Sequence, residues 1–365
     1  MELSSALAAL TKLGHPLRRA DVVACLARAH RIMPAFGPQA LSTLLWAVGR
    51  QGLRLRPDWA ARFLAAAAAR LPEFTPRAFA GLLHGLALVG HRPDAAWTVG
   101  FLVAAGRALP RAGARDLSDI AWALAKLQVR PPPEFTAALL AASRQRLAEF
   151  GPRGLAILAW ALGKLGAAPT PRWSAALLAE AARHLPDFSP QQRVNLIYGL
   201  ALMAAAGGGG QGGASFAAPP PPPPHEPAEA ASAPRAPRAP APRALPAAWV
   251  EAYLAAALAA LPACSAQGLA NLIYALSLLG VRPPEPWLRA FTAAVSAAAG
   301  SMEQVGWEAI TASFRRLGYR PDLTRAPPEG EGGGGGRARE RDAAGQLPPI
   351  AVLHRPPMRF NRQPL

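Results

Sequence analysis

The sequence repeats itself with a fixed period of 38 residues. An aromatic or histidine residue recurs inside a similar apolar run, and we number the positions of each repeat from this residue as position zero. The residues at position zero are Trp46, His84, Trp122, Trp160, Tyr198 and, two periods after Tyr198, Tyr274. A period of this length indicates a solenoid, in which each unit buries its apolar face only by stacking on its neighbours.

Each repeat carries the start and stop signals of helices. Nine residues before zero stand residues that N-caps favour or tolerate: Gly37, Thr75, Gly113, Gly151, Ser189 and Ser265. Six residues after zero stand glycines suited to ending a helix: Gly14, Gly52, Gly90, Gly166, Gly280 and Gly318. A preceding helix carries its own aromatic: Trp59, Trp97, Phe135, Trp173, Trp249 or Trp287. The sequence therefore predicts an all-α fold, a right-handed α-solenoid of helix-turn-helix repeats, with seven helix pairs after a single N-terminal helix.

Two segments interrupt the repeats. Residues 207–245 are rich in Gly, Pro and Ala and predict a disordered insertion, and residues 321–365 predict a disordered tail. Helical repeats then occupy residues 1–206 and 246–320. The insertion adds 38 residues between Tyr198 and Trp249 relative to the other junctions, so the repeats resume in phase and the solenoid is expected to continue across it.

The charge, cysteine content and hydropathy of the chain limit the classes of partner and site to be expected. The net charge of +17 favours an acidic partner, and nucleic acid is a better candidate than an anionic membrane surface. The alternative is that the charge only keeps the protein soluble. The two cysteines, Cys25 and Cys264, have no Cys or His at ligand spacing, so we expect no disulfide, metal or cofactor. No apolar run is long enough for membrane insertion. We also see no signal or transit peptide before the first repeat.

Helical geometry separates two faces of the helix that contains position zero. At about 100° per residue, positions −5, −2, −1, +2 and +5 share one side and are apolar almost throughout, which predicts the core. Positions −7, −3, 0 and +4 share the opposite side, and we call these residues the stripe. The candidate binding residues of the stripe are Gln39, Thr43, Trp46, Arg50, Arg77, His84, Arg115, Asp119, Trp122, Lys126, Arg153, Trp160, Lys164, Gln191, Asn195, Tyr198, Gln267, Asn271 and Tyr274.

The chemistry of the stripe suits single-stranded RNA. Arg and Lys neutralise phosphates, aromatic rings stack on bases, and variable Asn, Asp, Thr and Gln side chains can recognise base edges. Small residues at +1, Ala or Gly throughout, would let neighbouring helices pack closely. Two plainer alternatives stay open: the aromatic at zero packs against its neighbour, and the residues at −7 are solvated first-turn side chains.

The stretch "LSDIAWALAKLQVRPPPEF" (Leu117 to Phe135) resembles octotricopeptide repeat proteins, a family of 38-residue helical repeats found in green algal organelles. Arg130 to Phe135 and Arg282 to Trp287 are closest to that family's proline–glutamate–tryptophan signature. The resemblance covers nearly all of residues 1–320 outside the insertion. It implies RNA binding in organelle gene expression: transcript maturation, stability, splicing or translation, in the chloroplast or alternatively the mitochondrion, with other RNA-processing proteins as further partners.

No catalytic motif is evident, so we expect no enzyme. The seven histidines form no zinc-binding or His-Glu-x-x-His pattern, and the glycine runs lack the Lys-Ser/Thr of a phosphate-binding loop. The rival to RNA binding is an α-solenoid scaffold for protein partners. A peptide-binding groove would favour apolar or acid-binding pockets over the alternation of basic and aromatic side chains found in the stripe.

Overall fold

The structure, a computed structural model, describes residues 2–14, 18–207 and 245–320, which form helices α1 to α15 and contain no strand. After α1 (Glu2–Lys12), first and second helices of each repeat alternate. The first helices are α2 (Arg19–Ile32), α4 (Pro57–Ala68), α6 (Ala95–Ala108), α8 (Pro133–Gln145), α10 (Pro171–Arg183), α12 (Ala247–Ala260) and α14 (Glu285–Ala297). The second helices are α3 (Pro38–Arg50), α5 (Pro76–Val89), α7 (Ala114–Lys126), α9 (Pro152–Lys164), α11 (Pro190–Gly207), α13 (Ala266–Leu278) and α15 (Gln304–Leu317). The predicted seven pairs after one N-terminal helix are confirmed.

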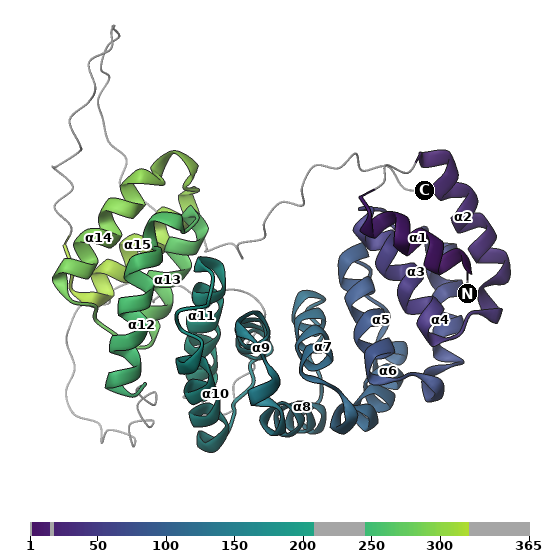
Figure 1. Ribbon diagram of the computed structural model, residues 1–365, viewed down its shortest axis with the longest axis horizontal. Helices are drawn as coiled ribbons and strands as arrows, with labels where there is room; N and C mark the ends of the chain where they lie inside the picture. The colour runs from purple at the N-terminus through teal and green to yellow at the C-terminus, as the bar shows by residue number, and fades with distance from the viewer. Residues whose placement is uncertain (1, 15–17, 208–244, 321–365) are drawn as a thin grey trace, which may run out of the picture.

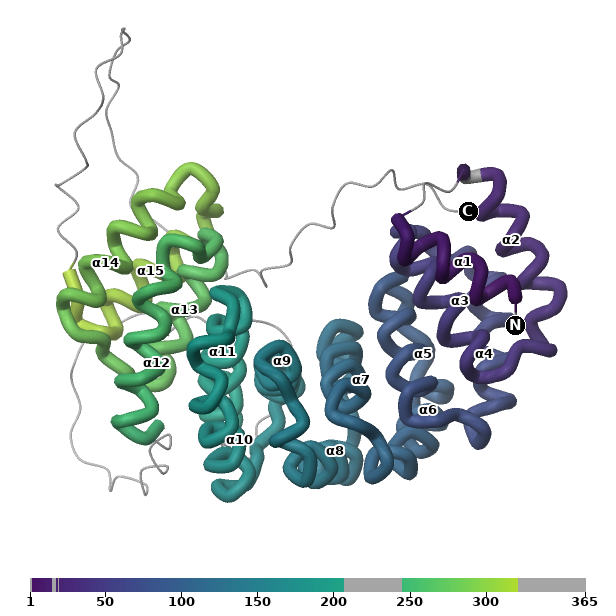
Figure 2. Tube along the Cα trace, viewed as in Figure 1, coloured from purple at the N-terminus to yellow at the C-terminus, as the bar shows by residue number. Residues whose placement is uncertain are grey.

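The helices form two curved layers (Figure 1). Each second helix packs against the second helices before and after it, and each first helix packs less extensively against neighbouring first helices. Figure 2 shows the second helices along the inner side of the arch and the first helices along its outer side. The predicted solenoid is therefore confirmed, and its concave face is built by the helices that carry the stripe.

The helix ends follow the sequence signals. The side chains of Thr75 and Ser265 accept hydrogen bonds from the backbone N–H groups of Ala78 and Gly268. Ser189 forms a reciprocal capping box with Gln192. Glycines with positive φ close the turns after α1 and after five of the second helices: Gly14, Gly52, Gly90, Gly166, Gly280 and Gly318. After α7 the same place is taken by Gln128, which adopts φ 55° without being glycine.

Tryptophans of the first helices tie the outer layer together. The indole N–H of Trp97 donates to the carbonyl of Leu64 at 2.9 Å, and that of Trp287 donates to the carbonyl of Leu254 at 3.0 Å, in each case on the preceding first helix. Trp173 instead donates to the buried hydroxyl of Ser143 at 3.1 Å. These tryptophans are structural, because burying an indole requires an acceptor for its N–H.

The same bond connects the repeats on either side of the predicted insertion. Trp249 of α12 donates to the carbonyl of Leu178 in α10 at 3.0 Å, as if the two repeats were adjacent in sequence. Helix α11 extends through Gly207, and Leu245 packs against the core just before α12. The rest of the predicted insertion, and the predicted tail 321–365, lie outside the described residues.

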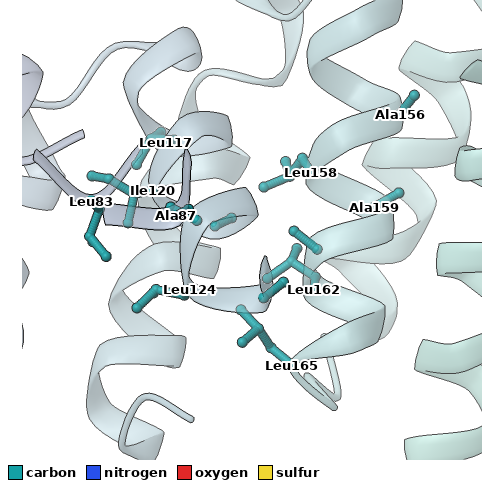
Figure 3. Packing of buried hydrophobic residues seen from close by; sticks show 14 of the residues in the cluster. Leu83, Ala87, Leu117, Ile120, Leu124, Ala156, Leu158, Ala159, Leu162 and Leu165 are labelled. Carbon is teal, nitrogen blue, oxygen red and sulfur yellow. The ribbon is translucent and has the colours of Figure 1, made fainter. Parts of the chain in front are cut away.

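The core lies between the layers and along the seam of second helices. The predicted core residues of α7 (Leu117, Ile120, Ala121, Leu124 and Leu127) are all buried. Figure 3 shows several of them facing buried residues of α5 and α9, among them Leu83 and Leu158. In α11 the predicted core position Arg193 is an exception, since its guanidinium donates to the carbonyls of Leu185 and Pro186 at the end of the preceding repeat.

Small residues allow the second helices to approach closely, as predicted. A Cβ atom added to Gly199 of α11 would lie 2.3 Å from the backbone carbonyl of Ala159 in α9, and one added to Gly85 of α5 would lie 2.9 Å from the side chain of Leu45 in α3. Within the described residues, no helix combines the length and apolarity needed to cross a membrane.

Candidate nucleic-acid interface

The stripe is the accessible side of the second helices. From α3 to α13 the residues at −7 are exposed, and those at −3 and zero are half-buried. The flanking residues at +1 are buried: Ala47, Gly85, Ala123, Ala161, Gly199 and Ala275. The structure thus brings the predicted site residues together on the concave face, one group from each second helix.

The residues at zero contact one another between helices. The rings of His84 and Trp122 stack with centroids 4.7 Å apart, and the rings of Tyr198 and Tyr274 lie 6.2 Å apart. Packing against a neighbour, which the sequence left open, therefore occurs at these pairs. Each ring nevertheless keeps part of its surface accessible, so packing does not remove it from the concave face.

Cations from the +4 position lie over some of these rings. Lys12 Nζ is 5.9 Å from the ring centroid of Trp46, and Lys164 Nζ is 5.5 Å from that of Tyr198. In both pairs the cation comes from the preceding helix, α1 or α9. At these two places the concave face sets a cation over an aromatic ring, and each contact stabilises the orientation of both side chains.

The centre of the face concentrates positive charge around His84. Burial lowers the pKa of His84; the carboxylate of Asp119 opposes this shift, while the charges of Arg153, Arg115 and Arg50 reinforce it. These groups come from α3, α7 and α9, so stripe residues of four successive second helices act on one point. The Nδ1 atom of His84 is buried without a hydrogen-bond partner.

Neighbouring stripe positions form polar pairs within a helix. Gln39 Nε2 donates to the Thr43 hydroxyl at 3.0 Å, and Gln191 Nε2 donates to Asn195 Oδ1 at 2.9 Å. Arg115 and Asp119 form an ion pair at 3.8 Å, in which the arginine side chain stays 83% exposed. Side-chain pairs one helical turn apart are only weakly stabilising, so a ligand can compete for either partner. In each pair the residue at −7 is exposed and accessible to a ligand.

The stripes of α11 and α13, toward the C-terminal end of the face, carry no charged residue. Burial raises the pKa of Tyr198 to about 12, with a further contribution from Tyr274. Burial also raises the pKa of Tyr274, against which the charge of Arg316 acts. Both phenols are therefore neutral at physiological pH. Burial lowers the pKa of Lys164 at the boundary between the charged and uncharged parts.

Two residues of the interface were missed by the sequence analysis. Lys12 and Arg316 occupy the +4 position of α1 and α15, four residues after Ala8 and Ala312. Both helices have alanine at position zero, in place of the aromatic or histidine that marks the other repeats. The 38-residue period alone would have assigned both residues to the same row as Arg50, Lys126 and Lys164.

The described residues contain no group of three or more His, Cys, Asp or Glu side chains that could hold a metal ion. Cys25 and Cys264 are free thiols, and burial raises the pKa of Cys264.

Residues 24–151 match the family model of the Tbc2 translation factor, C-terminal domain. The match begins within α2 and ends just before α9, so it covers about a third of the chain, including the His84–Trp122 stack. A search of curated proteins found no match. The chain is therefore similar over this region to a helical domain of a translation factor, and its assignment to the octotricopeptide repeats stays a prediction.

Proposed function

We propose that the chain binds single-stranded RNA selectively along its concave face and acts in organelle post-transcriptional gene expression. The observation that carries the proposal is the stack of the half-buried His84 and Trp122 rings, 4.7 Å apart, on the face where the stripes of α3, α7 and α9 present the exposed Arg50, Arg115 and Arg153. Cations beside accessible ring faces suit a single strand, whose phosphates and unstacked bases are both available. The match to a translation factor domain supports a role in translation among the possible RNA events.

The arrangement of the stripe can supply both the affinity and the base selectivity of such binding. Exposed Arg77, Arg115 and Arg153 at −7 and Lys126 at +4 can pair with phosphates, which gives affinity that depends on salt. The varied residues at −3 lie between them and can contact base edges. The net charge of +17 also speeds the approach of a polyanion. By the predicted resemblance, the chloroplast is the expected location and the mitochondrion the alternative.

The test is the binding of fluorescently labelled random single-stranded RNA and of duplex RNA to the full chain at several salt concentrations. The proposal predicts a preference for the single strand and a log–log salt slope of several phosphates, at about 0.7 per phosphate. Equal affinity for duplex and single strand would show that only net charge is acting, and absent binding would contradict the proposal.

One observation favours a protein scaffold as a second candidate. On the outer helix α6, Val99 and Val103 are 60% and 53% exposed. An outer-face partner would be compatible with RNA on the inner face. If the chain binds no RNA, and Val99→Ser with Val103→Ser abolishes copurification of a protein partner, the scaffold becomes the leading function.

A further inference from the structure

The stripes of α11 and α13 are identical. Helix α11 carries Gln191, Asn195, Tyr198 and Leu202, and α13 carries Gln267, Asn271, Tyr274 and Leu278. The stripes of α3, α5, α7 and α9 all differ from one another, and each contains at least one Arg or Lys. Two neighbouring helices thus present the same uncharged set of groups.

The two helices are consecutive on the concave face, although 76 residues separate Tyr198 from Tyr274 in the sequence. Helices α11 and α13 pack directly on each other, and the rings of Tyr198 and Tyr274 lie 6.2 Å apart. The bond from Trp249 to Leu178 shows that the outer layer is equally continuous there. In the part of the chain that the structure describes, no other second helix lies between the two stripes.

The groups offered by these stripes suit bases rather than phosphates. Leu202 and Leu278 stand where α7 and α9 have lysine, so the +4 position supplies no cation. The bond from Gln191 to Asn195 leaves the Asn195 amide N–H group as a donor and the Gln191 carbonyl as an acceptor. A neutral tyrosine ring beside them offers a stacking surface.

We propose that α11 and α13 form a duplicated base-recognition site that selects the same nucleobase at two adjacent positions of the RNA. The same side chains at the same positions of neighbouring second helices favour the same base, and one repeat contacts one base in comparable helical arrays. The inference rests on the proposed function, and it adds that the target contains a doubled nucleotide. The charged stripes of the earlier repeats would hold the rest of the strand.

The test is selection from a random single-stranded RNA pool by the full chain, followed by sequencing of the bound RNA. The expected motif has two adjacent positions with the same preferred base, and replacing either one weakens binding about 5- to 150-fold. Asn195→Asp and Asn271→Asp, which replace an amide donor with an acceptor, should each change the preference at one of these two positions. The combined variant should change both.

Two further variants keep the result interpretable. Gln145→Glu adds the same negative charge on the exposed end of outer helix α8 and should leave the motif unchanged. Asn271→Thr places at −3 the residue that α3 already carries as Thr43, so it should fold and still alter one position. RNA binding with different bases at the two positions, or without any response to the Asn195 and Asn271 variants, would overturn the duplicated site and leave the proposed function intact. No RNA binding by the unmodified chain would overturn the proposed function itself.

Discussion

At the scale of single residues, the turn after α7 departs from the rest of the solenoid. Gln128 has φ 55°, in the left-handed region where the corresponding residues of six other turns are glycine. A residue with a Cβ atom pays a steric cost in this conformation that glycine does not.

Gln128→Gly should therefore raise the free energy of unfolding by about 0.5–1 kcal/mol, after allowing for the greater freedom of glycine in the unfolded chain. Urea unfolding measures the change. The reverse substitution, Gly166→Gln, should lower stability by a similar amount. A Gln128→Gly protein less stable than the original would mean that the Gln128 side chain contributes more than its backbone conformation costs.

His84 makes stability depend on pH. Because burial lowers its pKa below 6.5, the unfolded chain binds more protons than the folded chain as the pH falls through that value. The free energy of unfolding should therefore fall between pH 6.5 and the folded pKa, by at most about 1.4 kcal/mol per pH unit for one proton. His84→Phe should reduce the loss of stability between pH 7.5 and pH 5. Because burial also lowers the pKa of His91, His91→Phe measures how much of the pH dependence comes from that second histidine. An unchanged pH dependence in His84→Phe would show that His84 titrates normally.

At the scale of helices, the spacing of the second helices depends on glycine. Gly199 faces the backbone of Ala159, and on the same two helices Gly163 faces the backbone of Gly199. Position +1 is Ala or Gly from α3 to α13. A Cβ added to Gly199 would lie 2.3 Å from backbone atoms of Ala159, closer than the 2.9 Å from a Cβ added to Gly85 to the Leu45 side chain.

Gly199→Ala should lower the free energy of unfolding by about 1–3 kcal/mol, because α9 and α11 must move apart. Gly100→Ala is the control: it lies in α6 with open space around its Cα and should be neutral or stabilising by up to about 1 kcal/mol. Thermal unfolding of the two variants compares them directly. Equal stability would show that the seam of second helices adjusts freely.

Most of the helices could be predicted from the sequence, because caps, glycines and the 38-residue period are local signals. The accessible side of each second helix followed from the helical angle alone. Contacts between helices could not be predicted, since they depend on how far one helix is offset from the next. The His84–Trp122 stack, the lysines over Trp46 and Tyr198, and the role of Arg193 are of this kind.

At the scale of the whole molecule, the solenoid separates two surfaces that both carry cationic side chains. The inner surface combines its cations with rings, and the outer surface carries Arg107 and Arg144 without a comparable row of accessible rings. Net charge alone would attract RNA to both surfaces equally. The central claim is that RNA occupies the inner one.

The measurement that tests this claim most directly compares RNA affinity in two double variants that remove equal charge. Lys126→Ala with Lys164→Ala removes two inner cations, and Arg107→Ala with Arg144→Ala removes two outer ones. Fluorescence anisotropy with single-stranded RNA, with thermal unfolding as a check on folding, should show weaker binding and a salt slope reduced by roughly 1–2 for the inner pair. The outer pair should bind almost as the original chain does. Equal losses in both variants, or a loss confined to the outer pair, would contradict RNA binding on the concave face.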